Sequence, residues 1–223
     1  IMCNVLIGTS ITLDELKDKY DAVFLGTGAG LPKFMGIDGE DANEVFSANE
    51  ILTRINLMGA YKGNSKTPIK RAKKAYVIGA GNVAMDAARL AIRLGADVTV
   101  LYRRTQEDMP AIESEYRDAV NEGVKFAWET SVTEFIGENG RLNSVRLQTP
   151  EGERVENFNR IFLAIGSRPA NRIVSTTDGI EVDEKGYVIT TERPYGMTTR
   201  AGVFAGGDVV HRPQTVVLAM KAA

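Results

Sequence analysis

Two short motifs carry residues whose types and spacing suit an anionic ligand. The first is VIGAGNVAMDAARL, which places Gly79, Gly81 and Ala84 in the spacing G-x-G-x-x-A. Gly79 permits a tight turn, Gly81 lets the backbone approach a pyrophosphate, and Ala84 permits close packing of a helix on a strand. Free N–H groups and the dipole at the start of the following helix favour a phosphate. The motif therefore predicts a dinucleotide-binding turn.

The second motif is the run YRRT at residues 102–105, at the end of the next expected strand. In chains that bind NAD, an acidic residue at this strand end accepts hydrogen bonds from the ribose 2′-OH. Arg103 and Arg104 instead offer guanidinium groups, which suit a 2′-phosphate. Exposed arginines are usually only solvated, but this position is where the ribose arrives. The sequence therefore predicts NADP(H) rather than NAD(H).

Other polar residues have simpler interpretations. Asn82 is expected to cap the helix, and Asp86 to lie in its first turn, where the helix dipole favours an acid. His211 is the only histidine and is expected to be a surface or structural residue. The sequence shows no nucleophile–base pair and no cluster of metal ligands, so it predicts no catalytic side chain and no metal site. Hydride transfer between two cofactor rings needs little side-chain acid–base chemistry.

The elements around these motifs alternate between strand and helix, which is typical of a doubly wound parallel sheet. Pro110 is expected in the first turn of the helix that follows the arginines. Expected strands are 22–25, 75–78, 97–102, 124–128, 161–165, 187–190 and 203–205. Expected helices are 13–20, 48–60, 82–94, 109–122 and 215–223. Three alternating runs, at 131–136, 142–149 and 153–157, predict an antiparallel meander.

Two further stretches shape the domain organisation. VFLGTGAGLPKF has glycines after a strand, but Leu31 and Pro32 stand where a helix would begin, and a proline disfavours helical backbone at the preceding residue. Gly26–Gly30 is therefore interpreted as a close-approach turn and not as a dinucleotide fingerprint. Residues 61–74, rich in turn formers and basic residues, are interpreted as a linker.

Composition narrows the class of protein. Hydrophobic residues make up 43% of the 223 residues and charged residues 25%, as in a globular chain with a core. A net charge of -2 argues against nucleic-acid binding driven by counterion release. No apolar run approaches the ~20 residues that span a bilayer, so no membrane partner is expected. A single cysteine, Cys3, is consistent with a reducing, cytoplasmic location. The first and last residues, IMCN and LAMKAA, lead us to expect a fragment of a longer protein.

With these motifs, the chain resembles the NADPH-dependent glutamate synthase small (beta) subunit family. The module of that family, which binds FAD and NADPH, recurs in dihydropyrimidine dehydrogenase and in NADP-ferredoxin oxidoreductases. The resemblance covers essentially the whole chain. It rests on TLDELKDKYDAVFLGTGAGLPKFMGIDGE, ANEILTRINLM, VIGAGNVAMDAARLAIRLGADVTVLYRRT, MPAIESE, LAIGSRPAN and GVFAGGDVVHRPQTVVLAMKAA.

The resemblance implies an α/β fold in which a Rossmann-like NADPH domain, with a parallel sheet and a three-stranded antiparallel meander, is inserted into an incomplete FAD-binding domain. It implies a first FAD segment at 1–65, the NADPH domain at 66–195 and a return FAD segment at 196–223. The family's first FAD fingerprint and its iron–sulfur segment are expected upstream of Ile1, so the FAD site is incomplete here and the iron–sulfur clusters belong only to that missing region.

The resemblance also implies two sets of cofactor-binding residues. The NADPH set holds the pyrophosphate, the 2′-phosphate and the neighbourhood of the nicotinamide, and it comprises Gly79, Gly81, Asn82, Val83, Arg103, Arg104 and Gly166. The FAD set forms part of the wall, the phosphate and ribityl contacts and a helix start facing the flavin, and it comprises Gly26, Gly28, Gly207, Asp208 and Thr215.

The implied function is a flavin-dependent oxidoreductase that takes hydride from NADPH to FAD and passes electrons to the glutamate synthase large subunit or to another electron-accepting partner. The isolated fragment is expected to be inactive, and its exposed apolar surface could support a homodimer. One alternative is a stand-alone dinucleotide-binding regulatory module, which would not need the second turn, AGGDVV. Another is an S-adenosylmethionine-dependent transferase, against which Arg103 and Arg104 argue. The lack of a Cys-x-x-Cys pair argues against a thioredoxin-reductase-like enzyme.

Overall fold

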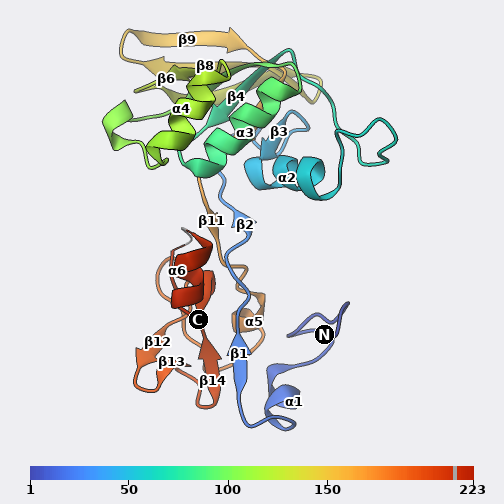
Figure 1. Ribbon diagram of the computed structural model, residues 1–223, viewed down its shortest axis with the longest axis vertical. Helices are drawn as coiled ribbons and strands as arrows, with labels where there is room; N and C mark the ends of the chain where they lie inside the picture. The colour runs from blue at the N-terminus through green and yellow to red at the C-terminus, as the bar shows by residue number, and fades with distance from the viewer. Residues whose placement is uncertain (213–214) are drawn as a thin grey trace. The chain divides into compact units, whose positions relative to one another are not determined.

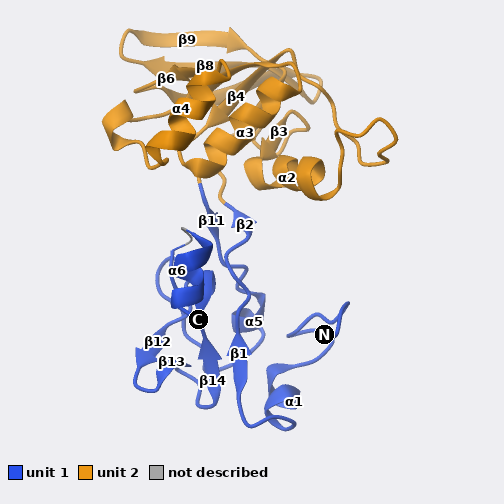
Figure 2. Cartoon of the chain, in the orientation of Figure 1, with its two compact units in different colours: residues 1–32, 166–223 blue, residues 33–165 orange. Residues whose placement is uncertain are grey.

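The computed structural model describes residues 1–212 and 215–223, and the chain forms two compact units (Figure 1, Figure 2). The first, which we call the central unit, is residues 33–165, and the second, the split unit, combines residues 1–32 with 166–223. Both boundaries differ from the expected junctions at 65/66 and 195/196. The stretch 61–74 therefore lies inside the central unit and does not link two units.

A five-stranded sheet forms the middle of the central unit. Its strands run in the order β3-β10-β4-β5-β6, and every neighbouring pair is parallel. The bounds are β3 Val45–Ser47, β4 Lys74–Ile78, β5 Asp97–Leu101, β6 Lys125–Ala127 and β10 Arg160–Leu163. Because β3 pairs with β10, residues 45–47 join this sheet, which explains why the central unit begins earlier than expected.

Alternate residues of the sheet face two different cores. In β4, Ala75 and Val77 pack among helix residues, whereas Tyr76 and Ile78 pack against the meander. This is the two-residue periodicity of a strand buried on both faces. The helical face carries α2 Ala48–Leu52, the π-helical turn η1 Thr53–Leu57, α3 Asn82–Arg93 and α4 Glu113–Asn121. The other face is covered by β7 Ser131–Glu138, β8 Arg141–Thr149 and β9 Gly152–Asn157.

The expected elements of the central unit are present, with two differences in the helices. The helix expected at 48–60 is α2 followed by the π-helical turn η1, which ends at Leu57. The other difference is the start of α4. Alanines on one side of α3, among them Ala84 and Ala88, are fully buried and allow the helix to lie close to the sheet. The antiparallel meander is present in the order β7-β8-β9. Helix α4 begins at Glu113 instead of residue 109, so Pro110 precedes the helix. A short 3₁₀ turn, η2 Gln106–Asp108, takes up part of the connection.

The split unit has a smaller sheet in the order β1-β14-β13-β12. Strand β1 Val23–Leu25 is parallel to β14 Val203–Ala205, whereas β13 Tyr195–Thr198 and β12 Thr190–Glu192 complete an antiparallel edge. A two-stranded ribbon joins β2 Leu31–Pro32 to β11 Ser167–Arg168. The remaining elements are α1 Leu13–Lys17, α5 Arg172–Ser175, η3 Gly207–Val209 and α6 Val216–Lys221. The strand expected at 187–190 is not formed over that range: Val188 makes an isolated β-bridge to Val182, and strand β12 begins only at Thr190. Within residues 1–212 and 215–223, no helix is long and apolar enough to cross a membrane.

Candidate functional site

The turn after β4 requires glycine at its first position. Gly79 has φ +114°, and its N–H donates to the Leu101 carbonyl oxygen at 3.0 Å. A Cβ at this position would lie 2.5 Å from the carbonyl oxygen of Ala164, just beyond the end of β10. Residues with a side chain rarely adopt this backbone conformation, and moving the backbone of Ala164 aside would cost free energy. Gly79 therefore lets the chain turn where two strand ends come close together.

Gly81 serves a different purpose, because it faces open space. A Cβ there would meet only Pro110 Cγ, at 4.0 Å. Gly81 is the N-cap residue of α3, and no side chain caps this end of the helix. The first N–H groups of a helix lack partners within the helix, and its dipole favours an anion. The residues present therefore fit a pyrophosphate whose oxygens approach the backbone.

The interpretation of Asn82 as the helix cap is wrong. Asn82 is the first residue of α3, and its Oδ1 accepts a hydrogen bond from the Ile112 N–H at 2.8 Å. This bond ties the start of α3 to the residue that precedes α4. The Ala111 N–H also donates to the Ala80 carbonyl oxygen, at 3.2 Å. Two hydrogen bonds to the loop before α4 thus fix the conformation of the turn.

Asp86 does not lie in the first turn of α3 either. Partial burial raises the pKa of its carboxyl group above the ordinary value, the neighbouring Glu115 carboxylate raises it further, and Arg89 opposes the change. The helix dipole is therefore not what places an acid here. Val83, expected beside the pyrophosphate, is an exposed residue of the first turn.

The arginine pair follows directly from β5. Arg103 and Arg104 are exposed, and the backbone around them is fixed by hydrogen bonds to the segment after β6. The Thr130 N–H donates to the Tyr102 carbonyl oxygen, and the Glu129 N–H donates to the Arg104 carbonyl oxygen. Within the described residues, neither arginine forms an ion pair.

The glycine turn and the arginine pair leave the sheet at the same edge. Strands β4 and β5 are parallel neighbours, and their last residues, Ile78 and Leu101, are register partners. Parallel sheets of this kind bind ligands outside the carboxyl ends of their strands. The central unit therefore brings together, among its described residues, an uncapped helix start and two cationic side chains that form no ion pair.

The split unit gathers most of the second set of glycines. Gly26 and Gly28 follow β1, and Gly207 and Asp208 follow β14, which is its parallel partner. The Gly206 N–H donates to the Leu25 carbonyl oxygen at 3.2 Å, so the two turns start side by side. No helix follows Gly26–Gly30, because the chain enters β2, as Pro32 predicted.

The two remaining predicted residues lie elsewhere in the split unit. Thr215 caps α6, with its Oγ1 accepting a hydrogen bond from the Leu218 N–H. Gly166, the first residue of the returning chain, has φ +98°.

One hollow in the split unit includes residues that the sequence did not single out. It has a volume of about 400 Å³, and Asp208 shares its lining with Tyr195, His211 and Arg212. Tyr195 was not predicted, because strand β13 was not expected. His211 was interpreted as a surface or structural residue, and it is exposed.

Comparison with known proteins identifies the family. The model of the pyridine nucleotide-disulphide oxidoreductases matches residues 4–223. The chain belongs to this family. The family implies binding of FAD and a pyridine nucleotide, which agrees with two separate sets of glycine turns, each following a pair of parallel strands.

Individual relatives include two oxidoreductase subunits and one solved structure. The small chain of NADPH glutamate synthase from Escherichia coli (strain K12) is 30% identical, over 97% of this chain and 51% of its own length. The beta subunit of NADPH-Fe(3+) oxidoreductase from Geobacter sulfurreducens (strain DL-1 / KN400) is 34% identical, over 97% of this chain and 37% of its own. Thioredoxin reductase from Lactococcus lactis superposes with a TM-score of 0.70 and 25% identity, over 90% of this chain and 61% of its own. The chain thus spans only about half, or less, of the curated relatives' length.

Proposed function

We propose that the central unit binds NADPH and that the split unit contributes part of a FAD site, so that hydride passes from NADPH to FAD. In the whole protein, the electrons then pass to a partner subunit, as in an enzyme of the glutamate synthase type. The names of two relatives support this proposal. One is the small chain of NADPH glutamate synthase, and the other is the beta subunit of NADPH-Fe(3+) oxidoreductase. We further propose a cytoplasmic location and, if the chain is part of a longer protein, iron–sulfur clusters in the remainder of that protein.

One observation carries the proposal: the uncapped start of α3 and the two unpaired arginines share one edge of the sheet. Gly81 and the first N–H groups of α3 would hold the pyrophosphate. Arg103 and Arg104 would hold the 2′-phosphate, which distinguishes NADPH from NADH. Bound NADPH supplies the hydride. The chain's own residues supply binding and orientation, because the candidate site needs no side-chain acid or base.

The first test removes each arginine separately. Arg103→Ala and Arg104→Ala should each weaken NADPH binding by about 10- to 100-fold, since a charge-assisted hydrogen bond contributes on the order of 1.5–3 kcal/mol. NADH should be affected far less, because it has no phosphate for the guanidinium to bind. Arg103→Glu should reduce the preference for NADPH further, because it repels the phosphate and offers an acceptor to a free 2′-OH. Calorimetric titration of both nucleotides measures these effects.

Arg117→Ala is the matched control, because Arg117 is an exposed arginine on α4 whose partner is Glu113, four residues earlier. It should leave both affinities unchanged. If the wild-type chain binds NADH as tightly as NADPH, or if the two alanine variants weaken both nucleotides equally, the arginine pair is only a solvated turn and the assignment to NADP(H) fails.

A further inference from the structure

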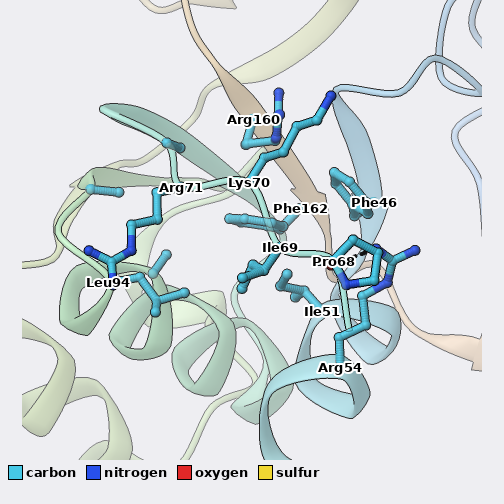
Figure 3. Close-up of a pocket in the computed structure, with 13 residues that line it drawn as sticks. Phe46, Ile51, Arg54, Pro68, Ile69, Lys70, Arg71, Leu94, Arg160 and Phe162 are labelled. Carbon is cyan, nitrogen blue, oxygen red and sulfur yellow. Dashed lines mark hydrogen bonds between the residues drawn. The ribbon is translucent and has the colours of Figure 1, made fainter. Parts of the chain in front are cut away.

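Another hollow lies in the central unit, near the amino ends of β4 and β10. The glycine turn and the arginine pair lie at the opposite, carboxyl ends of the strands of this sheet. It is a shallow hollow with a cavity volume of only about 30 Å³. Its lining includes Ala72 just before β4 and Arg160 at the start of β10 (Figure 3). The nucleotide turn follows the other end of β4, which spans roughly 15 Å at the rise of a strand. A ligand in this hollow would therefore leave the candidate nucleotide site free. We call this hollow the basic slot.

The floor of the basic slot is apolar. Phe46 of β3, Ile51 of α2 and Phe162 of β10 line it (Figure 3). Ile51 and Phe162 are buried in the core of the helical face, whereas Phe46 is only partly buried. The Phe46 and Phe162 rings lie with their centroids 6.4 Å apart. An apolar side chain lying across this shallow floor, rather than inserted into it, would remove apolar surface from water.

The rim of the basic slot is cationic, and most of its charge lacks a partner. Arg54, Lys70, Arg71 and Arg160 surround the floor (Figure 3). Arg54 pairs with Glu50 at 2.7 Å. Across residues 1–212 and 215–223, Lys70, Arg71 and Arg160 take part in no ion pair. The free charges sit around an apolar floor, where a bound anion would be less screened than on an open surface.

Arg160 also carries a donor without an acceptor. Its Nε atom is buried and has no hydrogen-bond partner. Its guanidinium carbon lies 6.0 Å from the centroid of the Phe46 ring, and that of Arg54 lies 5.6 Å from the same centroid. Two cations thus share one aromatic ring, and an unmet buried donor is energetically costly. A carboxylate in the slot would separate the two positive charges and give Arg160 an acceptor once its side chain turns.

The segment next to the slot carries a net positive charge, whereas the net charge of the whole chain is negative. Residues 61–74 contain six Lys or Arg residues and no Asp or Glu, although the net charge of the chain is -2. A local positive field of this kind attracts an acidic partner. Nucleic acid fits less well, because the chain is acidic overall and the recognition surface has an apolar floor. Inorganic phosphate has no apolar part to occupy that floor.

We propose that the basic slot binds an acidic segment of a partner polypeptide. One apolar side chain of that segment lies on Phe46, Ile51 and Phe162, and the flanking carboxylates meet Lys70, Arg71 and Arg160. This interface is separate from the proposed NADPH site. Each proposal can therefore be tested, and can fail, independently of the other. A partner bound here would be held on the central unit while the edge with Gly81 and Arg103 stays open to nucleotide.

The test uses the whole 223-residue chain and a labelled peptide, acetyl-Glu-Glu-Phe-Glu-Glu-amide, followed by fluorescence anisotropy at low salt. Saturable binding is expected. Arg160→Gln should weaken it by about 10-fold, and Arg71→Gln, at a more exposed site, by about 3-fold. Lys66→Gln is the matched control, because Lys66 belongs to the same basic run but does not line the slot. It should change binding by less than about 2-fold. Circular dichroism and urea denaturation of each variant verify that it is folded, independently of nucleotide binding.

Two control peptides separate the contribution of the peptide's charge to binding from that of its contact with the apolar floor. Acetyl-Lys-Lys-Phe-Lys-Lys-amide and acetyl-Glu-Glu-Gly-Glu-Glu-amide should bind at least about 10-fold more weakly, since one reverses the charge and the other lacks the apolar side chain. The proposal is overturned if the acidic phenylalanine peptide does not saturate, if the glycine peptide binds equally well, or if Lys66→Gln weakens binding as much as Arg71→Gln. It is also overturned if a short oligo-dT strand binds more tightly than the peptide and loses affinity on Arg71→Gln.

Discussion

At the scale of single residues, the two positions before α3 are occupied by glycine for different physical reasons. Gly79 is required by the fold, because its positive φ and the carbonyl oxygen of Ala164 leave no room for a side chain. Gly81 has an ordinary φ of -86° and open space in front of it, so nothing in the fold demands glycine there. A ligand that approaches the backbone supplies the missing reason at Gly81.

This difference predicts opposite effects for two matched substitutions. Gly79→Ala should destabilise the chain by about 2–4 kcal/mol, through strain at positive φ and the contact with Ala164. Gly81→Ala should cost about 1 kcal/mol or less, yet weaken NADPH binding by at least about 10-fold. Urea denaturation and NADPH titration of both variants measure the two quantities. Tight NADPH binding by Gly81→Ala would show that the pyrophosphate does not contact this backbone.

The sequence located these glycines but misjudged their polar neighbours. The spacing G-x-G-x-x-A specifies a strand, a turn and a helix, and these are local features that a sequence pattern records. Asn82 was misjudged because its acceptor role depends on Ile112, thirty residues away in the chain. Asp86 was misjudged because its surroundings include Glu115 of another helix. Side-chain partners of this kind follow from packing and leave no pattern in the sequence.

At the scale of elements, the strands with continuous or alternating apolar residues were predictable, and the short ones were not. The meander, β14 and α3 were found nearly at their observed bounds because their periodicity is strong. Strands β2, β3 and β11 have only two or three residues, too few to show a period. Strand β3 is defined by its pairing with β10, and missing it displaced the expected domain boundary.

Helices α3 and α4 are joined by a cluster of charged side chains. Glu122, at the C-cap of α4, accepts hydrogen bonds from Arg93 at 2.6 and 2.8 Å and from Arg89 at 2.8 Å. The bonds from Arg93, and then those from Arg89, lower the pKa of Glu122 from its ordinary 4.5 to about 2. The carboxylate form is therefore favoured in the folded chain, and this contact holds α3 against α4.

Because the pKa of Glu122 is lower in the folded than in the unfolded chain, its contribution to stability is present above about pH 4.5 and is lost as the pH falls towards 2. Glu122→Gln should lower the free energy of unfolding by about 1 kcal/mol at neutral pH, a modest value because the pair is partly exposed to solvent. The difference from wild type should shrink in acid, which urea denaturation at several pH values would show. Glu113→Gln, which removes only an exposed pair with Arg117, should have a smaller effect. An equal effect of both variants would contradict the coupling of α3 to α4.

At the scale of the whole molecule, the two units present their glycine turns in different settings. In the central unit the turn opens the twelve-residue helix α3, so N–H groups and a helix dipole are available to a phosphate. In the split unit, Gly26–Gly30 leads into the two-residue strand β2, and α6 has its first turn capped by Thr215. The chain also spans only about half, or less, of its curated relatives' length. The structure thus favours nucleotide binding at the central unit over flavin binding at the split unit.

We therefore predict that this chain binds NADPH but does not transfer its hydride without added flavin. The split unit lacks a helix start behind Gly26–Gly30, so its remaining contacts should not offset the free-energy cost of ordering a long ligand such as FAD. Hydride transfer needs the two rings in contact, at ~3–3.5 Å, so an absent flavin leaves no acceptor. The purified chain should show no stoichiometric flavin absorbance and should not reduce a dye with NADPH, although the same preparation binds NADPH in a titration. A yellow preparation, or dye reduction without added flavin that disappears in Asp208→Ala, would show instead that the split unit holds FAD without a helix behind its first turn.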